Sequence, residues 1–249
     1  MKLLAIFILY ALALTAALAR AGYRARKTSS PRAPARKRIS RVLIIGATGG
    51  TGRELVAQAL ERGYEVTALA RDPTKLQITS PQLTVMRGDV LDYDSIAQAM
   101  RGQDAVLSAL GHQRYFYPTR ILSAGTRNIL RAMAAQGATR FVCATSLGIG
   151  DSAGRLGVLY TFFIIPLILP FYFWDKAKQE RIIAESELDW TIVRPGALRN
   201  SKESGRYRSG AHLGSFIQTR SIARAEVAAF MLEQLHSEEF HHSAVGVAQ

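Results

Sequence analysis

A glycine-rich turn between an apolar strand and a helix constrains this chain more than any other feature. Val42–Ile45 is an apolar run, a cluster of glycines follows it, and a helical pattern continues over Arg53–Arg62. Glycine permits a tight turn and a close approach of the backbone to a ligand. The helix that begins near Gly50 directs unpaired N–H groups and its positive dipole end toward an anion. The stretch therefore predicts a pyrophosphate site formed by Gly46, Thr48, Gly49, Gly50, Thr51 and Gly52.

Strand and helix patterns alternate along the rest of the chain. Apolar runs predict strands over Val42–Ile45, Glu65–Ala70, Leu83–Met86, Ala105–Leu110, Arg140–Ala144, Trp190–Val193 and Ala244–Val247. Helical patterns lie between them, at Tyr93–Met100, residues 121–133, Lys176–Glu187 and Ala223–Leu235. Alternating strands and helices predict a doubly wound parallel α/β sheet with right-handed crossovers. We expect one such domain over residues 42–249.

The net charge of +13 is concentrated in the leader rather than in this domain. Ten of the 32 Lys and Arg precede Val42, so the rest of the chain carries 22 bases against 19 acids. A nearly neutral domain argues against a nucleic-acid partner. The single cysteine, Cys143, excludes an intrachain disulfide and a cysteine-based metal cluster. No metal site is expected, and His241-His242 is interpreted as a surface pair.

The first 19 residues form a hydrophobic leader. Leu3–Ala19 carries no charge and is near the lower length limit of a membrane-spanning helix. We expect a signal-anchor over residues 1–19, a basic flexible linker over 20–41, and a domain that faces the cytoplasm, because positive charge stays on that side. Ala17-Leu18-Ala19 also resembles a signal-peptidase site. Cleavage near Ala19 and export of the domain is therefore the alternative.

A second uncharged stretch covers residues 156–174. Pro166 and Pro170 interrupt it, and a span inside a contiguous domain would separate the strands of the sheet. Two interpretations remain: a buried helix that packs on the domain, or an apolar flap that enters the bilayer surface or lines an apolar substrate pocket.

The end of the second strand indicates which dinucleotide binds. A site for NAD places an acid at this strand end to hold the ribose 2′-hydroxyl. Here Ala70 precedes Arg71, whose guanidinium can hold a 2′-phosphate. This favours NADP, with the reservation that Asp72 can turn inward. Positions at the ends of the third and fourth strands are expected to flank the cofactor: Asp89, Val90, Ala109, Leu110 and Gly111.

Four motifs occur in order: Gly46-Ala-Thr-Gly-Gly-Thr-Gly52, Gly88-Asp89-Val90, Ala144-Thr145-Ser146 and Leu188-Asp-Trp-Thr-Ile-Val-Arg-Pro-Gly196. Together they resemble the atypical short-chain dehydrogenase/reductases, in particular the NAD(P)H-binding group with biliverdin reductase B-like and NmrA-like members. The resemblance implies a Rossmann-type fold over residues 41–249 and an NAD(P)H cofactor, of which Arg71 favours NADPH. It also implies that Pro195, Gly196 and Leu198 pass beside the nicotinamide.

Three side chains are candidates for the chemistry. The resemblance implies that Ser146 hydrogen-bonds a substrate carbonyl, and Tyr172 and Lys176 have the Tyr-x-x-x-Lys spacing of the superfamily. A lysine ammonium near a phenol lowers the pKa of that phenol, which makes it a usable acid. The alternative for Lys176 is an ion pair with Glu180 on a solvated helix face. Relatives in the group usually lack the tyrosine and take the proton from solvent or the substrate environment.

We expect an NADP-dependent oxidoreductase at a membrane surface. Its small-molecule substrate would be an apolar or aromatic acceptor of the quinone, flavin or carbonyl type. The alternative is a non-catalytic NADP-binding redox sensor or assembly factor.

Overall fold

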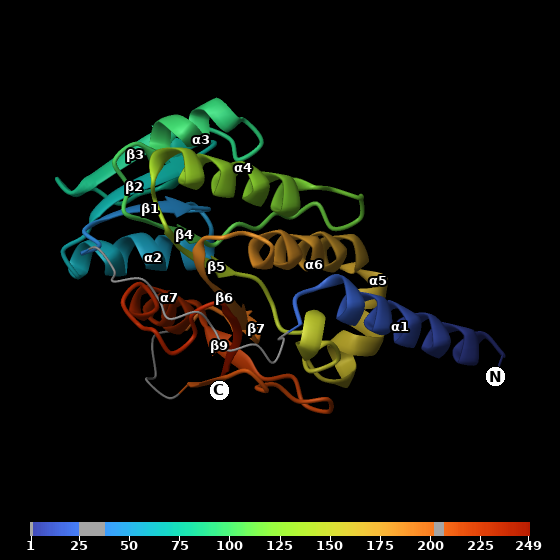
Figure 1. The fold of residues 1–249 in the computed structure, drawn as a ribbon. Helices are drawn as coiled ribbons and strands as arrows, with labels where there is room; N and C mark the ends of the chain where they lie inside the picture. Colours follow the sequence, from blue (N-terminus) through green and yellow to red (C-terminus); the bar gives the residue numbers. More distant parts are fainter. Residues whose placement is uncertain (1, 25–37, 202–206) are drawn as a thin grey trace.

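An eight-stranded sheet runs through the molecule in the order β3-β2-β1-β4-β5-β6-β10-β8 (Figure 1). The computed structural model describes residues 2–24, 38–201 and 207–249. The strands are β1 (Arg41–Ile45), β2 (Glu65–Ala70), β3 (Leu83–Arg87), β4 (Ala105–Ser108), β5 (Arg140–Ala144), β6 (Asp189–Pro195), β8 (Arg208–Gly210) and β10 (Ser243–Ala248). Neighbours pair in parallel except β8, which is antiparallel to β10.

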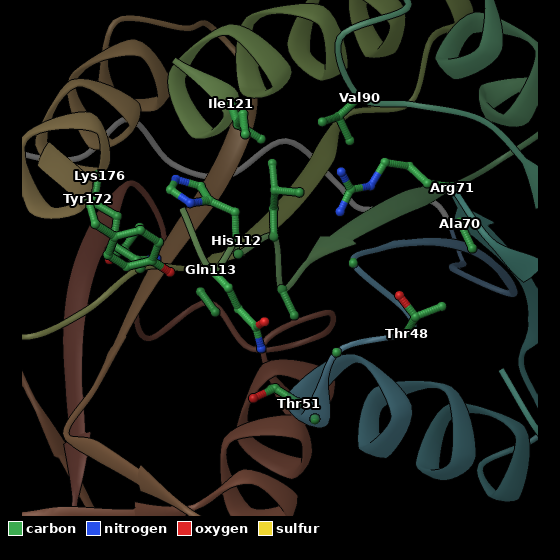
Figure 2. Close-up of a pocket in the computed structure, with 18 of the residues that line it drawn as sticks. Thr48, Thr51, Ala70, Arg71, Val90, His112, Gln113, Ile121, Tyr172 and Lys176 are labelled. Carbon is green, nitrogen blue, oxygen red and sulfur yellow. The ribbon is translucent and has the colours of Figure 1, made fainter. Parts of the chain in front are cut away.

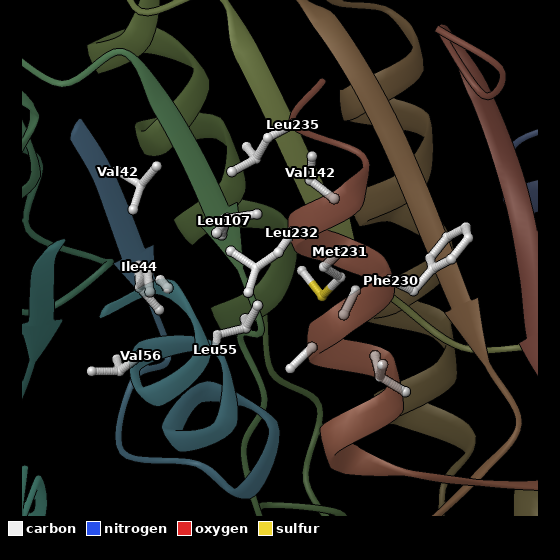
Figure 3. Close-up of a cluster of buried hydrophobic side chains, with 14 of the residues drawn as sticks. Val42, Ile44, Leu55, Val56, Leu107, Val142, Phe230, Met231, Leu232 and Leu235 are labelled. Atoms are coloured by element: carbon white, nitrogen blue, oxygen red, sulfur yellow. The ribbon is translucent and has the colours of Figure 1, made fainter. Parts of the chain in front are cut away.

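Helices cover both faces of the sheet, which confirms the predicted doubly wound Rossmann-type fold. One face packs on α2 (Gly50–Glu61) and α7 (Arg224–Glu233). Figure 3 shows this layer, in which Ile44 and Leu107 of the sheet meet Leu55 and Met231 of the helices. The other face packs on α3 (Tyr93–Met100), α4 (Ile121–Gln136) and α6 (Pro170–Ala184). Burial of these apolar side chains is the main force that holds the layers together.

The order of the strands creates a crevice between β1 and β4. The chain passes from β1 to β2 and β3 on one side and then returns to place β4 on the other side of β1. The loops that leave the carboxyl ends of β1 and β4 therefore diverge. In open α/β sheets, this switch point is where ligands bind.

Element bounds differ from the predictions at a few points. The fourth strand ends at Ser108 rather than Leu110, and α6 begins at Pro170, so Tyr172 lies inside the helix. Three short strands were not predicted: β7 (Ala197–Arg199), β8 and β9 (Ser221–Ala223). Each has three residues, which is too short for an alternating pattern to be recognised.

Residues 156–174 form a broken helical segment that packs with one face only. It contains η3 (Tyr160–Ile164), α5 (Ile165–Leu167) and the first turn of α6. Pro170 is the first residue of α6, where its missing N–H costs nothing. Pro166 instead lies in α5, which continues directly from the π-helical turn η3. Ile165 and Phe173 are buried, whereas Phe163 and Leu167 are exposed. The segment therefore packs on the domain but is only partly buried, and one apolar face remains exposed.

The N-terminal helix α1 (Lys2–Ala21) packs along α6 and η3 with one narrow face. Ala11 and Leu18 are buried in that contact, while most of the other side chains are exposed. Its length and composition would allow it to cross a membrane. The start of the expected linker is also packed, since Arg181 Nη2 donates to the Arg20 carbonyl at 2.9 Å and Tyr23 lies against Trp190. Residues 25–37 of that linker lie outside the described residues.

Candidate functional site

A cavity of about 460 Å³ lies at the switch point of the sheet. Figure 2 shows Thr48 and Thr51 of the glycine turn on one side and Tyr172 and Lys176 on the other, with Gln113 between them. Most of the predicted site residues line it: Gly46, Thr48, Gly49, Gly50, Thr51, Arg71, Asp89, Val90, Ala109, Leu110, Gly111, Tyr172, Lys176, Pro195 and Leu198. The fold therefore brings segments that are up to 150 residues apart to one site.

The glycine turn leaves the N-terminus of α2 open toward the cavity. Gly46 has φ +80°, and a Cβ there would lie 2.6 Å from the Ala109 carbonyl oxygen. The N-cap residue Gly49 provides no side-chain acceptor, and the first helical bond runs from Arg53 N to Gly49 O at 2.9 Å. The preceding N–H groups of α2 have no partner within the helix, so they are available to an anion.

Arg71 and Asp72, the two residues that follow β2, have different surroundings. Arg71 lines the cavity beside Ala70. The Asp72 carboxylate instead accepts from Thr74 Oγ1 at 2.6 Å and from Thr74 N at 3.2 Å, which caps the short helix η1 (Pro73–Lys75). Those hydrogen bonds lower the pKa of Asp72. The acid is thus held in a local turn, and the guanidinium is the charged group at the end of β2.

Three predicted residues are not among the described residues that line the cavity: Gly52, Ser146 and Gly196. A Cβ on Gly52 would overlap the Gly46 carbonyl oxygen, so this glycine serves the packing of α2 on the turn. Thr145 lines the cavity in place of Ser146. Thr145 N still pairs with Val193 O at 2.7 Å, and side chains alternate along such an extended segment. The two neighbouring side chains therefore point to opposite sides, and the Thr145 hydroxyl proton is donated to Glu180 Oε1 at 2.7 Å.

Helix α6 presents Tyr172 and Lys176 to the cavity. Lys176 is 4% exposed, and its ammonium lies over the Tyr172 ring, 5.2 Å from the centroid. Within the described part of the chain, Lys176 makes no hydrogen bond or ion pair. The ion pair with Glu180 on a solvated face is therefore wrong, because Glu180 is fully buried and accepts from Arg194.

A buried polar network stands behind Lys176. Glu180 Oε1 accepts from Thr145 Oγ1 at 2.7 Å and from Arg194 Nε at 2.9 Å, and Glu180 Oε2 accepts from Arg194 Nη2 at 2.7 Å. Arg194 also binds Asp151 and donates to the Tyr23 carbonyl at 3.0 Å. The paired carboxylates raise the pKa of Arg194 even though burial alone would lower it. This network fixes α6, the end of β5 and the segment after α1 relative to one another.

A second buried carboxylate fixes the N-terminal half of α6. Asp175 accepts from Leu122 N at 2.9 Å and from Ser123 N at 3.3 Å, and also from the Ser123 hydroxyl. The carboxylate therefore satisfies the first N–H groups of α4 and compensates its positive dipole end. Tyr172 and Lys176 flank Asp175 in the helix, so their positions follow from this contact.

The loop after β4 supplies the residues that the sequence analysis did not assign to the site. His112 and Tyr115 line the cavity, and their rings contact Tyr172 at centroid distances of 4.9 and 5.6 Å. His112 Nδ1 accepts from Arg114 N at 3.1 Å, and Nε2 pairs with Thr119 Oγ1 at 3.0 Å. Burial lowers the pKa of His112, so the ring is neutral at pH 7. No local periodicity marks this loop; the only available signal was the position of His112 next to Gly111.

Arg224 also lines the cavity without having been predicted. It is the first residue of α7, and its side chain lies against Gly50, where a Cβ would meet its Cδ at 2.5 Å. The guanidinium donates to Asn200 Oδ1 at 2.6 Å. The sequence offered no signal for it, because it is about 170 residues from the glycine turn.

One histidine cluster lies apart from this cavity. Asp189, His241 and His242 approach one another closely enough to share a metal ion. Asp189 Oδ1 is, however, already bound to Arg140 Nη1 at 2.8 Å and to His241 Nδ1 at 2.6 Å. His241 is only 8% exposed, so the interpretation of a surface pair is wrong. The guanidinium supplies the positive charge that the carboxylate requires, and the cluster is a buried ion pair.

Cys143 is predicted to be inert toward thiol reagents in the folded protein. It is buried in β5, and this burial raises the pKa of its thiol to about 12. Only the thiolate reacts, so maleimide at pH 8 should leave the native protein unlabelled and should label it fully in denaturant. Because the chain has a single cysteine, mass spectrometry measures this site directly. Rapid labelling of the native protein would contradict the burial of β5.

Comparison with known proteins supports the cofactor assignment. The model of a family described as NAD(P)H-binding matches residues 46–238. A chloroplastic protein of Arabidopsis thaliana is 30% identical over 220 residues, which cover 84% of this chain and 77% of that protein.

Two solved structures share the fold over most of their length. A Rossmann-fold NAD(P)-binding family protein from Shigella flexneri has a TM-score of 0.65 and 27% identity, covering 85% of this chain and 94% of its own. The anaerobillin reductase ChuY of Escherichia coli O157:H7 has a TM-score of 0.69 and 23% identity, covering 84% and 96%. At that identity, the second structure supports the fold alone.

Proposed function

We propose that this chain, which belongs to the NAD(P)H-binding family, is an NADPH-dependent oxidoreductase. Its substrate is a small apolar or aromatic acceptor. One observation carries the proposal: a single cavity joins the glycine turn to a wall of Lys176, Tyr172 and His112. A quinone, a flavin or an apolar carbonyl compound suits that wall. Flat acceptors pack on aromatic rings, and their oxygens accept hydrogen bonds from a cation.

The residues of this chain would bind and orient the reactants. When bound, the reduced nicotinamide supplies a hydride to the acceptor. The open N-terminus of α2 holds the pyrophosphate, and Arg71 holds the 2′-phosphate. The Lys176 ammonium faces the cavity and would stabilise negative charge that develops on the acceptor oxygen. The proton would come from Lys176 Nζ, from the Tyr172 hydroxyl or from solvent.

His112 is assigned a positioning role. Both ring nitrogens are engaged within the loop after β4, and the ring packs edge-on against Tyr172. A neutral, hydrogen-bonded imidazole can hold the loop and the tyrosine ring in place. It has no free proton to give to the acceptor while those bonds persist.

The experiment that tests this function is NADPH oxidation against a panel of quinones, flavins and apolar aldehydes and ketones. We expect steady oxidation with at least one class. Tight binding of NADPH without oxidation by any acceptor would instead support a redox sensor or assembly factor. The assay therefore separates the two functions that the sequence leaves open.

NADPH should bind more tightly than NADH, and Arg71→Ala should remove most of this preference. Arg71 lines the cavity, while Asp72 is held by Thr74. Loss of one charge-assisted pair with a phosphate corresponds to about 1.5–3 kcal/mol, or roughly ten- to hundredfold in affinity for NADPH. Titration of the wild type and the variant with NADPH and with NADH measures these affinities. Arg62→Ala, at the other end of α2, removes the same charge as a control. A wild-type preference for NADH would contradict the assignment.

We further propose that α1 remains attached and anchors the protein, with the domain on the cytoplasmic side. The burial of Ala11 and Leu18 against the domain supports retention of α1, because cleavage near Ala19 would remove both contacts. The basic residues that follow the helix favour this orientation. N-terminal sequencing of the protein from its native host tests it. A mature chain that begins at Arg20 would support export instead.

A further inference from the structure

We propose that the acceptor enters the cavity from the lipid phase, through a surface of this chain that is inserted in a bilayer. The inference rests on the proposed oxidoreductase function and assigns the acceptor to the lipid-dissolved class. The insertion surface consists of the exposed side of α1 and the exposed side of residues 158–174. Its members include Leu4, Leu9, Phe163, Leu167, Phe171 and Trp174, which are 39–64% exposed.

The two parts of the insertion surface form one continuous face. The Phe7 and Phe163 rings contact each other with a centroid distance of 6.2 Å, and Tyr10 Oη donates to Pro166 O at 3.4 Å. Further along, Arg181 Nη2 donates to Arg20 O at 2.9 Å. Helix α1 and residues 163–181 therefore run side by side in the same direction, and Figure 1 shows α5 beside α1. A contiguous apolar surface that spans two helical segments marks an interaction site.

The surface changes from apolar to basic at the same level on both elements. On α6, Phe171, Trp174, Lys178 and Arg181 follow one another at helical spacing on one exposed face. The Lys178 ammonium lies over the Trp174 ring, 5.7 Å from its centroid. On α1, the only charge after Lys2 is Arg20, which is next to Arg181. Aromatic residues beside cations at one end of an apolar surface match the headgroup level of an anionic bilayer.

The aromatic end of the cavity lies next to this surface along α6. Tyr172 lies on the cavity side of α6, while its neighbour Phe171 belongs to the insertion surface. In the loop after β4, Tyr115 contacts the Tyr172 ring, and the next two residues, Phe116 and Tyr117, are 68% and 72% exposed. An apolar molecule that leaves the bilayer at this point would therefore pass aromatic side chains on its way to Lys176. A lipid-soluble quinone or apolar carbonyl compound has this chemistry.

The two tryptophans of the chain allow a direct test of insertion. The full chain is reconstituted in vesicles of phosphatidylcholine and phosphatidylglycerol, with phosphatidylcholine brominated near the headgroup end or the methyl end of its acyl chain. We expect the fluorescence of Trp174 to be quenched, more strongly by the first lipid because of its place beside Lys178. Trp190 is 3% exposed and should not be quenched, so Trp174→Phe should abolish the effect. Absence of quenching, as would result if a second copy covered this face, overturns the proposal.

The second test concerns entry of the acceptor. The measured quantity is a ratio of two turnover rates: the rate with a long-chain quinone dissolved in the vesicles over the rate with a short-chain, water-soluble quinone. Phe116→Ser with Tyr117→Ser should lower this ratio about tenfold, the equivalent of one lost aromatic contact. The control pair is Phe216→Ser with Ile217→Ser, whose side chains are 63% and 77% exposed but whose neighbours are Arg155 and Val158 rather than the cavity residue Tyr115. An unchanged ratio in the first variant, or an equal fall in both, overturns lipid-phase entry.

The two tests also separate this inference from the proposed function. If the protein reduces no acceptor of any kind, the oxidoreductase function fails and lipid-phase entry fails with it. The quenching of Trp174 would still decide whether the insertion surface exists. If short-chain quinones are reduced but Trp174 is not quenched, the function stands and the insertion surface is wrong.

Discussion

Lys176→Met is expected to reduce turnover, or the affinity for NADPH, by one to two orders of magnitude. Lys176 is buried at the cavity wall and, among the described residues, contacts the Tyr172 ring without a hydrogen bond or ion pair of its own. Methionine retains most of the apolar stem and removes the ammonium. The expected loss corresponds to about 1.4–2.7 kcal/mol of transition-state or cofactor binding.

The matched control for that substitution is Lys178→Met on the same helix. Lys178 is exposed and lies over the Trp174 ring, so its loss should change turnover less than twofold. Steady-state kinetics with NADPH and nucleotide titration measure both variants. If Lys176→Met folds, binds NADPH and turns over like the wild type, the assignment of Lys176 to the chemistry is wrong.

Arg194→Met is expected to destabilise the fold by about 3–5 kcal/mol, because it leaves Glu180 as an uncompensated buried charge. Arg194 and Glu180 are 1% and 0% exposed, and their Nη2 and Oε2 atoms are 2.7 Å apart. Arg194 also holds Asp151 and the Tyr23 carbonyl. Urea unfolding of the full chain in detergent micelles gives the change in free energy.

A double variant shows whether Arg194→Met destabilises the fold because it leaves a charge unpaired or because it creates a packing defect. Arg194→Met with Glu180→Met removes both charges, and replacement of a buried pair by apolar groups is often close to neutral. We expect the double variant to be more stable than Arg194→Met alone. Arg208→Met, an exposed residue of β8, is the control for the loss of one arginine. If the double variant is less stable than either single one, the ion pair is not the reason for the effect.

The glycine turn and the order of strands and helices could be predicted from sequence because they depend on neighbours in the chain. The turn after Ile45 needs glycine at position 46 for φ +80°, and no distant residue is required to recognise it. The apolar runs of β1 and β5 are buried on both faces, as expected for central parallel strands. The resemblance to the NAD(P)H-binding group is confirmed by the family that matches residues 46–238.

The choice between neighbouring side chains required the tertiary structure. The motif Ala144-Thr145-Ser146 indicates a hydroxyl after β5, but only the structure shows that Thr145 lines the cavity and that its hydroxyl donates to Glu180. Similarly, Arg71 and Asp72 are both present at the end of β2, and the bonds of Asp72 to Thr74 decide between them. The catalytic roles of Tyr172, Lys176 and Ser146 stay predictions, and Ser146 lies outside the described lining of the cavity.

Sequence was sufficient to predict the glycine turn, the alternation of strands and helices, and the apolar character of α1 and residues 156–174. Three contacts became apparent in the folded chain alone: α1 packs on α6, Glu180 binds Arg194 rather than Lys176, and the loop after β4 meets Tyr172. The physical reason is the same in each case. Periodicity and composition report on residues within a few turns of one another, whereas partner choice among buried charges and rings depends on how distant helices dock.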